Sequence, residues 1–180
     1  MAHRIAVIAG DGIGLEVIPA GIDVITRAAG AAGASLEFTH FEWGSEYYLR
    51  TGKMMPADAL DILKGFDAIY LGAVGDPRVP DHVSVWELIL PIRQRFNQYV
   101  NLRPMRLMPS VTGPLAGRGP RDIDMICVRE NSEGEYAGAG FRRGNGTATD
   151  RAEQTGIFTR EGIERIAHYA FTLEIGRAHV

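Results

Sequence analysis

The chain has 180 residues, of which 46% are hydrophobic and 23% are charged, as is typical of a soluble globular protein. Its formal net charge of −3 excludes a general electrostatic attraction to nucleic acid or to an anionic membrane. The N-terminal apolar run is too short for a signal peptide or a membrane span. We therefore expect a cytoplasmic protein with neither nucleic acid nor membrane as a partner.

Cys127 is the only cysteine, so no disulfide can form within one chain. It lies in the apolar run DIDMICV, which is typical of a strand. We expect a buried and chemically inert thiol, because buried cysteine behaves as a small hydrophobic residue.

Strand and helix patterns alternate through the first part of the chain. The expected elements are a strand over 4–10, a helix over 15–29, a strand over 35–43, a helix opened by Pro56 and a strand over 66–74. The last strand is apolar almost throughout, as in a sheet covered on both faces. This order predicts an α/β fold.

The segment GDGIG, residues 10–14, does not have the G-x-G-x-x-G spacing of the dinucleotide-binding fingerprint. We interpret it as a tight turn with close packing of strand and helix, in which Gly12 and Gly14 supply unusual backbone angles. The loop over 75–82 follows the third strand. Ligands tend to bind at such strand ends in open α/β sheets.

Ser84 and Glu87 have the S-x-x-E spacing of a capping box, so we expect a helix to begin there and Pro91 to kink or divide it. Four residues at helical spacing share one face of this helix: Trp86, Ile89, Leu90 and Arg93. An arginine at the end of an apolar stripe is either a solvated rim residue or a clamp for a carboxylate.

The organisation changes near Val100, where strands with long loops replace the strand–helix alternation. We expect strands over 101–108 and 122–130 around a Gly/Pro-rich loop, and a hairpin-like excursion over 133–150 that returns over 153–158. A last helix should be capped by Thr159 and broken at Gly176. Its expected apolar face is Ile163, Ile166, Ala167, Ala170 and Phe171.

Two arginines and a tyrosine in this part could serve chemistry. Arg103 precedes Pro104, which cannot donate to a neighbouring strand, so this strand should lie at an edge or a bend. Arg129 ends an apolar strand and needs a carboxylate partner, either Glu130 or Glu133 locally or a substrate. Tyr136 is either a core residue or a general acid. The five histidines show no metal-ligand spacing.

The segments AVIAGDGIGLEV, YLGAVGDP, PIRQRFNQYVNLRP and VRENSEGEYAG resemble, in order and approximate spacing, the β-decarboxylating 2-hydroxyacid dehydrogenases. This family includes the isopropylmalate, isocitrate, homoisocitrate and tartrate/D-malate enzymes. WGSEYYLRTGKMMP and PLAGRGPRDIDMICVREN resemble its tartrate/D-malate branch. The resemblance implies a two-domain α/β fold of the isopropylmalate dehydrogenase type, of which only the N-terminal half is present.

The resemblance also implies roles for particular residues. It assigns the clamp of the substrate's β-carboxylate to Arg93, Arg103 and Arg129, and protonation of the enolate carbon after loss of CO₂ to Tyr136. Glu130 and Glu133 match residues that hold these groups in place. Contact with the variable part of the substrate is implied for Trp86, Ile89 and Leu90, and contact with the nicotinamide end of NAD for Gly72, Ala73, Val74 and Gly75.

Other parts of the family pattern have no match here. Neither Lys53 nor Lys64 matches the family's base, and no aspartates match its Mn²⁺ or Mg²⁺ site, so we expect the metal ligands C-terminal to this chain. Residues 1–99 are expected to form part of the first domain. Residues 100–180 would begin a second, dimer-forming domain with an arm at about 135–158, so we expect a homodimer in the whole protein.

The expected activity is therefore NAD-dependent oxidative decarboxylation of a small 2-hydroxy diacid, D-malate or tartrate, in the whole protein. The 180-residue piece alone is expected to be inactive. The alternatives are an isopropylmalate-type enzyme, a non-catalytic regulatory homologue and an α/β binding module without chemistry. A regulatory homologue would be expected to lack the arginines or the tyrosine, whereas this chain has all four.

Overall fold

A computed structural model describes residues 2–178. The chain forms two compact units, Met1–Arg95 and Phe96–Val180, each described by itself. The first unit contains β1 (His3–Gly10), α1 (Gly14–Ala31), β2 (Leu36–His40), α2 (Ser45–Thr51), α3 (Ala59–Leu63), β3 (Ala68–Ala73), α4 (Asp81–Ser84), the π-helical turn η1 (Val85–Ile89) and α5 (Leu90–Arg95). The second contains β4 (Val100–Arg106), β5 (Asp124–Glu130), β6 (Gly134–Arg143), β7 (Arg151–Ile157) and α6 (Arg160–Ala178).

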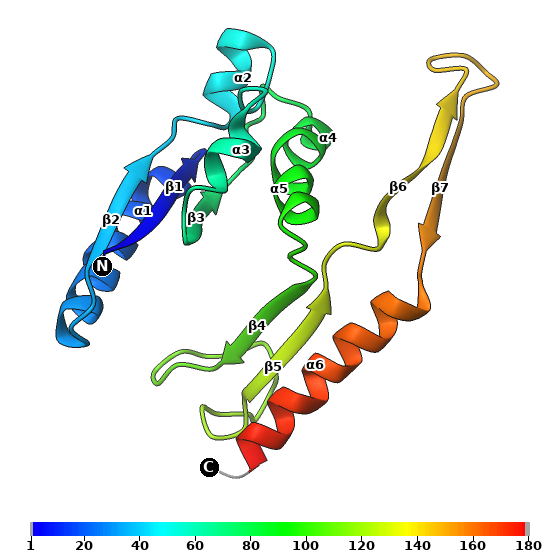
Figure 1. Cartoon of the computed structure of the whole chain (residues 1–180). Coiled ribbons are helices and arrows are strands. Elements are labelled where there is room, and N and C mark those ends of the chain that lie inside the picture. The colour runs from blue at the N-terminus through cyan, green and yellow to red at the C-terminus, as the bar shows by residue number, and fades with distance from the viewer. Residues whose placement is uncertain (1, 179–180) are drawn as a thin grey trace. The chain divides into compact units, whose positions relative to one another are not determined.

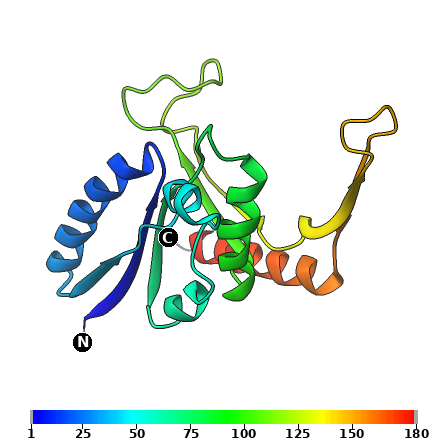
Figure 2. The ribbon, with the colours of Figure 1, turned by 90° about the horizontal axis from the view of Figure 1, so that it is seen from above.

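The first unit is built on a parallel three-stranded sheet in the order β2-β1-β3 (Figure 1). The central strand β1 has neighbours on both sides, and its residues Ala6, Val7 and Ile8 are fully buried. Helix α1 runs along the sheet (Figure 2) and buries Ile18 against it. The α/β fold predicted for this part of the chain is confirmed.

The turn between β1 and α1 brings backbone close to backbone, as expected for GDGIG. Gly10 and Gly12 have positive φ angles of 75° and 49°. Gly14 is different, because it begins α1 with an ordinary φ, so the unusual angle predicted for it is wrong. A Cβ at Gly14 would collide with the carbonyl oxygen of Ala9 and lie 2.9 Å from the nitrogen of Ala73. Gly14 is therefore required by close packing rather than by its backbone angle.

Helix α2 was not predicted, and β2 ends at His40 instead of continuing to Trp43. The chain turns at Gly44, whose φ is 145°, and α2 starts at the next residue. The helix predicted to open at Pro56 begins only at Ala59, with Asp58 as its N-cap. Both differences occur in short helices of 7 and 5 residues, where the sequence window is too short for periodicity to decide.

The helical segment before Arg95 does not begin at Ser84, so the predicted capping box is wrong. Its first helix, α4, has Pro80 as N-cap, and Ser84 is buried without a hydrogen bond to its hydroxyl group among the described residues. The helical run continues through Pro91 into α5, so Pro91 does not divide it, and the kink stays a prediction. Pro91 has no N–H for the α-helical bond, and the chain widens just before it into η1, in which Leu90 N–H bonds to Val85 O.

The second unit contains two antiparallel strand pairs and one long helix. Strand β4 pairs with β5, and α6 packs against β5 (Figure 1). The predicted hairpin is confirmed as β6 and β7, which extend away from the start of α6. Among the described residues β4 has β5 as its single partner, so Pro104 lies in an edge strand as expected.

Three predictions for the second unit are corrected. Cys127 is exposed rather than buried, because the face of β5 opposite α6 has no cover among residues 2–178. Gly176 does not break α6, which continues to Ala178. The predicted apolar face of α6 is only partly covered, since Ile163 and Phe171 are exposed. None of the helices in residues 2–178 has the length and apolar composition needed to cross a membrane.

Replacing Gly14 by alanine is predicted to destabilise the first unit, because the methyl group would meet the backbone of β1 and β3. Overpacking of this kind costs about 1–3 kcal/mol. Gly30 in the same helix is the matched control, since nothing lies within 4 Å of the position of its Cβ. Gly30→Ala should leave the midpoint of thermal unfolding unchanged or raise it. Equal melting temperatures for the two variants would contradict the packing argument.

Candidate functional site

A cleft of about 720 Å³ opens at the carboxyl ends of the parallel strands in the first unit. Strands β2 and β3 lie on opposite sides of β1. The order of the strands therefore reverses at β1. Such switch points are the usual ligand sites of open α/β sheets. The residues that line the cleft include Asp11, Glu46, Asp76 and Arg78.

Asp11 fixes the floor of this cleft. The residue is only 7% exposed, and its carboxylate accepts hydrogen bonds from the backbone and hydroxyl of Ser45, at 2.9 and 2.6 Å, and from the backbone of Gly75, at 3.0 Å. One carboxylate therefore joins the β1–α1 turn, the start of α2 and the loop after β3. This role is not visible in the sequence, because Ser45 is 34 residues away and Gly75 is 64 residues away.

A second polar cluster holds the loop after β3 against α2. Arg78 donates to both carboxylate oxygens of Asp76, at 2.9 and 2.7 Å, and also pairs with Glu46 of α2. The hydrogen bonds from Arg78 lower the pKa of Asp76 to about 2. Asp76 is consequently an anion at physiological pH, and Asp76 and Glu46, two of the acidic residues that line the cleft, are both engaged by one guanidinium group.

The four residues expected to contact NAD lie at the end of β3 and just after it. Gly72 packs so closely that a Cβ would collide with Ala9 O, and Ala73 O accepts the N–H of Asp11 at 2.7 Å. Val74 is half-buried, and Gly75 has a φ of 153° with nothing within 4 Å of its Cβ position. None of these four residues lines the cleft, which begins in this loop at Asp76, but the open backbone at Gly75 leaves room for the close approach of a ligand.

The residues expected to contact the variable part of a substrate differ in exposure. Trp86 is 43% exposed, whereas Leu90 is 1% exposed and belongs to the core of the first unit. Ile89 and Arg93 are half-buried, and Arg93 has interactions of its own. The π-helical turn changes the number of residues per turn in this segment. Residues at the two ends of the predicted stripe, Trp86 and Arg93, are therefore no longer at regular α-helical spacing. Substrate contact by these residues stays a prediction.

In the second unit, Arg103 and Arg129 lie on one face of the β4–β5 pair. Arg129 is opposite Asn101, and Arg103 is two residues further along β4. Side chains at such diagonal positions have their Cβ atoms roughly 7–8 Å apart. The strand pairing therefore places the two guanidinium groups within reach of one small anion.

Tyr136 of β6 lies beside Arg129. The guanidinium group of Arg129 donates a hydrogen bond to the Tyr136 hydroxyl and lies 5.2 Å from the centre of its ring. Neither Glu130 nor Glu133 forms an ion pair with Arg129 within the described part of the chain. The local carboxylate partner considered from the sequence is thus not formed, and both glutamates bond to the loop and to α6 instead.

No group of three or more His, Cys, Asp or Glu side chains in residues 2–178 could hold a metal ion. The residues described here therefore do not fit the Mn²⁺ or Mg²⁺ site that the resemblance implies. Arg103, Arg129 and Tyr136 are suited to binding an anion, positioning it and moving a proton at the Tyr136 hydroxyl.

The chain belongs to the isocitrate/isopropylmalate dehydrogenase family, which it matches over residues 4–180. The chain is 54% identical over 176 residues to the D-malate dehydrogenase [decarboxylating] of Escherichia coli (strain K12), covering 97% of this chain and 49% of that protein. It is also 54% identical over 174 residues to the tartrate dehydrogenase/decarboxylase of Pseudomonas putida, covering 96% and 48%.

The fold agrees with this assignment. The crystal structure of isocitrate dehydrogenase from Methylococcus capsulatus superposes with a TM-score of 0.75 at 28% identity, over 98% of this chain and 48% of that one. The resemblance found in the sequence motifs and the predicted fold class are therefore confirmed. The chain spans about half the length of the curated relatives that it matches.

Replacing Asp11 by asparagine is predicted to loosen the cleft, because an amide nitrogen cannot accept hydrogen bonds from Ser45 and Gly75. The loss of partners for buried donors costs about 1–3 kcal/mol. The matched control is Asp58→Asn, which changes an exposed aspartate in the same unit. A lower urea midpoint for Asp11→Asn than for Asp58→Asn is expected, and indistinguishable midpoints would refute the role of Asp11.

Proposed function

We propose that the whole protein oxidises and decarboxylates a small 2-hydroxy diacid, D-malate or tartrate, with NAD as the electron acceptor. The main support from the structure is the contact between Arg129 and Tyr136 on the face that also presents Arg103. The relatives named D-malate dehydrogenase and tartrate dehydrogenase/decarboxylase support the choice of substrate.

The two arginines suit the recognition of a carboxylate. A guanidinium group offers parallel N–H donors that match the two oxygens of a carboxylate, and such charge-assisted pairs fix orientation as well as position. Arg103 and Arg129 would hold the β-carboxylate, so that the carbon–carbon bond that breaks is kept in a defined direction. The contribution of Arg93, which lies in the other unit, stays a prediction from the resemblance.

The bonds that change follow from the reaction class. The C–H bond at carbon 2 breaks, and the hydrogen leaves as a hydride with both bonding electrons. The hydroxyl proton goes to a base, and neither Lys53 nor Lys64 matches the family position of that base. The bond to the β-carboxylate then breaks, releases CO₂ and leaves its electron pair on an enolate. The Tyr136 hydroxyl would give its proton to the enolate carbon, completing the 2-oxo acid product.

NAD would bind at the carboxyl edge of the parallel sheet, where Gly72, Ala73, Val74 and Gly75 precede Asp76, which lines the cleft. When bound, NAD supplies the hydride acceptor. The open backbone at Gly75 and the volume of about 720 Å³ support this placement. We propose that the divalent metal, Mn²⁺ or Mg²⁺, is held by residues outside 2–178.

We further propose a homodimer of the whole protein in which the β6–β7 hairpin serves as the arm. Its exposed apolar residues Phe141, Ile157 and Phe158 support this, since a partner chain would cover them. The alternatives are an isopropylmalate-type substrate and a non-catalytic regulatory role. A substrate panel distinguishes the first, and the regulatory role predicts no turnover with any diacid.

The roles of Arg129 and Tyr136 are tested by substitution in the whole protein. Tyr136→Phe should lower kcat by about 10²- to 10⁴-fold, as for loss of a general acid. Arg129→Gln should weaken transition-state binding by about 2–5 kcal/mol, taking a broken buried charge pair as a guide. Initial rates of NADH formation from D-malate and tartrate provide the measurement.

Arg106→Gln is the matched control, because Arg106 lies on β4 and pairs with Asp124 at an exposed position. It should retain the activity of the wild type. Wild-type protein that forms no NADH with any member of a panel of 2-hydroxy diacids would overturn the proposed function.

The 180-residue chain produced alone is predicted to be inactive, because no metal cluster lies within its described residues. It is also predicted to associate, since Phe171 and Phe158 are 72% and 67% exposed. The measurements are NADH formation with D-malate and Mn²⁺, and light scattering of the purified chain. Metal-dependent turnover by this chain would contradict the prediction.

A further inference from the structure

The relative position of Arg129 and Tyr136 is not set by strand pairing. Arg129 is the penultimate residue of β5, and Tyr136 lies near the start of β6. The β6–β7 ladder is interrupted between Gly134 and Ala139, where its register shifts. Tyr136 falls within this interruption, so strand pairing does not fix its position, and the loop over 131–133 that leads to β6 can contribute to it.

Glu130 folds this loop. Its carboxylate accepts hydrogen bonds from the backbone and hydroxyl of Ser132, at 2.9 and 2.6 Å, and from the backbone of Glu133, at 2.7 Å. Burial alone would raise the pKa of Glu130, but hydrogen bonds from Ser132, Glu133 and Arg165 outweigh burial and lower it. Glu130 is therefore an anion that organises the turn immediately after Arg129.

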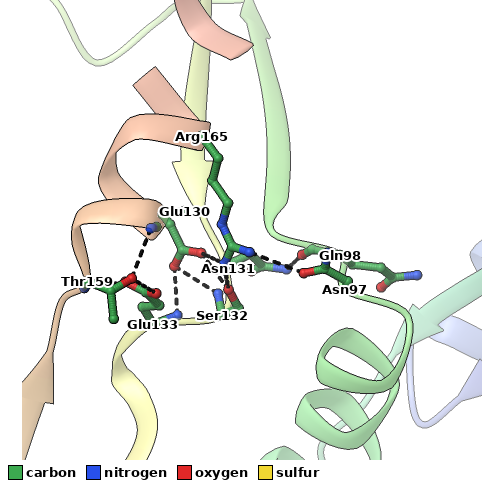
Figure 3. Close-up of polar contacts among 9 residues, drawn as sticks. Asn97, Gln98, Glu130, Asn131, Ser132, Glu133, Thr159 and Arg165 are labelled. Atoms are coloured by element: carbon green, nitrogen blue, oxygen red, sulfur yellow. Dashed lines mark hydrogen bonds and ion pairs between the residues drawn. The ribbon is translucent and has the colours of Figure 1, made fainter. Parts of the chain in front are cut away.

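Arg165 of α6 holds this turn from the other side (Figure 3). Its guanidinium group donates to the Ser132 hydroxyl at 2.7 Å and to Glu130 at 3.3 Å. The Arg165 and Glu130 side chains are only 24% and 21% exposed, so solvent screens the pair weakly. Further contacts to Asn97, at 3.3 Å, and to the ring of Tyr99, at 4.7 Å, fix the direction of the guanidinium group.

Glu133 attaches the same loop to the start of α6. Its carboxylate accepts the backbone N–H of Thr159 at 2.9 Å and the Thr159 hydroxyl at 2.5 Å. These hydrogen bonds lower the pKa of Glu133. The Thr159 hydroxyl in turn accepts the N–H of Gly162 at 2.9 Å, which confirms the cap predicted from the sequence.

We propose that Arg165 and Thr159 are positioning residues, which hold the loop between Arg129 and Tyr136 so that the phenol faces the bound substrate. Neither residue contacts the two reacting side chains, and both act through Glu130 and Glu133. This inference rests on the proposed function. It adds Arg165 and Thr159 to the residues that support the proposed active site, although neither is expected to contact substrate or NAD.

The first test compares Arg165→Met, Arg165→Lys and the control Arg160→Gln in the whole protein. Arg160 is exposed on the same helix and pairs with Glu164. Because a misplacement of about 1 Å can cost roughly 10²-fold in rate, Arg165→Met should lower kcat by roughly 10- to 100-fold. The KM for NAD should stay unchanged, Arg165→Lys should recover part of the rate, and Arg160→Gln should match the wild type.

A second measurement does not depend on turnover. Tyrosine is replaced by 3-fluorotyrosine, and the ¹⁹F resonance of Tyr136 is assigned by its loss in Tyr136→Phe. Arg165→Met should shift or broaden this resonance, whereas Arg160→Gln should leave it unchanged. A resonance that is unaffected by Arg165→Met overturns the inference even if the wild type proves inactive, and inactivity by itself overturns only the proposed function.

Gly162→Ala tests the loop attachment if Arg165→Met fails to fold. Alanine favours the helical conformation more than glycine does. However, its methyl group would collide with the Glu133 carboxylate and displace it from Thr159. A folded variant with a lowered kcat and a shifted Tyr136 resonance supports the inference. If the melting temperature changes while kcat and the Tyr136 resonance stay as in the wild type, the inference is overturned and the loop attachment has a purely structural role.

Discussion

A carboxylate that binds the chain just after a strand is the interaction on which both units depend. Asp11 follows β1 directly and binds Ser45 and Gly75, and Glu130 is the last residue of β5 and binds Ser132 and Glu133. In each case one carboxyl side chain accepts backbone N–H groups and a serine hydroxyl that would otherwise lack protein partners. Charge-assisted hydrogen bonds of this kind are roughly twice as strong as neutral ones, so a single side chain can hold a functional loop in one conformation.

The regular part of the fold could be predicted because it depends on local patterns. Strand β1 is an apolar run ended by glycine, and Thr159 marks the start of α6. Helix α2 could not be predicted in this way, because Asp11 binds its first residue from 34 positions away. The capping box at Ser84 failed for the opposite reason. A correct local spacing was overridden by a helix that already begins after Pro80.

The site could be predicted only in part. Motif resemblance selected Arg129 and Tyr136, and the structure brings these two side chains into contact. Their support was not visible in the sequence, because Arg165 lies 33 residues after Ser132 and nothing in its helix distinguishes it from the exposed arginine five positions earlier. Cys127 shows the same limit, since its exposure depends on whether a neighbour covers one face of β5 rather than on the composition of the strand.

The hydrogen bonds of Glu130 and Glu133 within the loop also determine whether the positive charge of Arg129 has a carboxylate partner. Both carboxylates are near Arg129 in sequence, yet their oxygens are occupied by Ser132, Thr159 and Arg165. Within the described residues Arg129 bonds to the hydroxyl group of Tyr136 and to no carboxylate. A half-buried guanidinium group without an anionic partner favours an anion from solution, because binding it compensates the charge. The proposed preference for a substrate carboxylate thus follows from the way in which the loop uses its own acidic side chains.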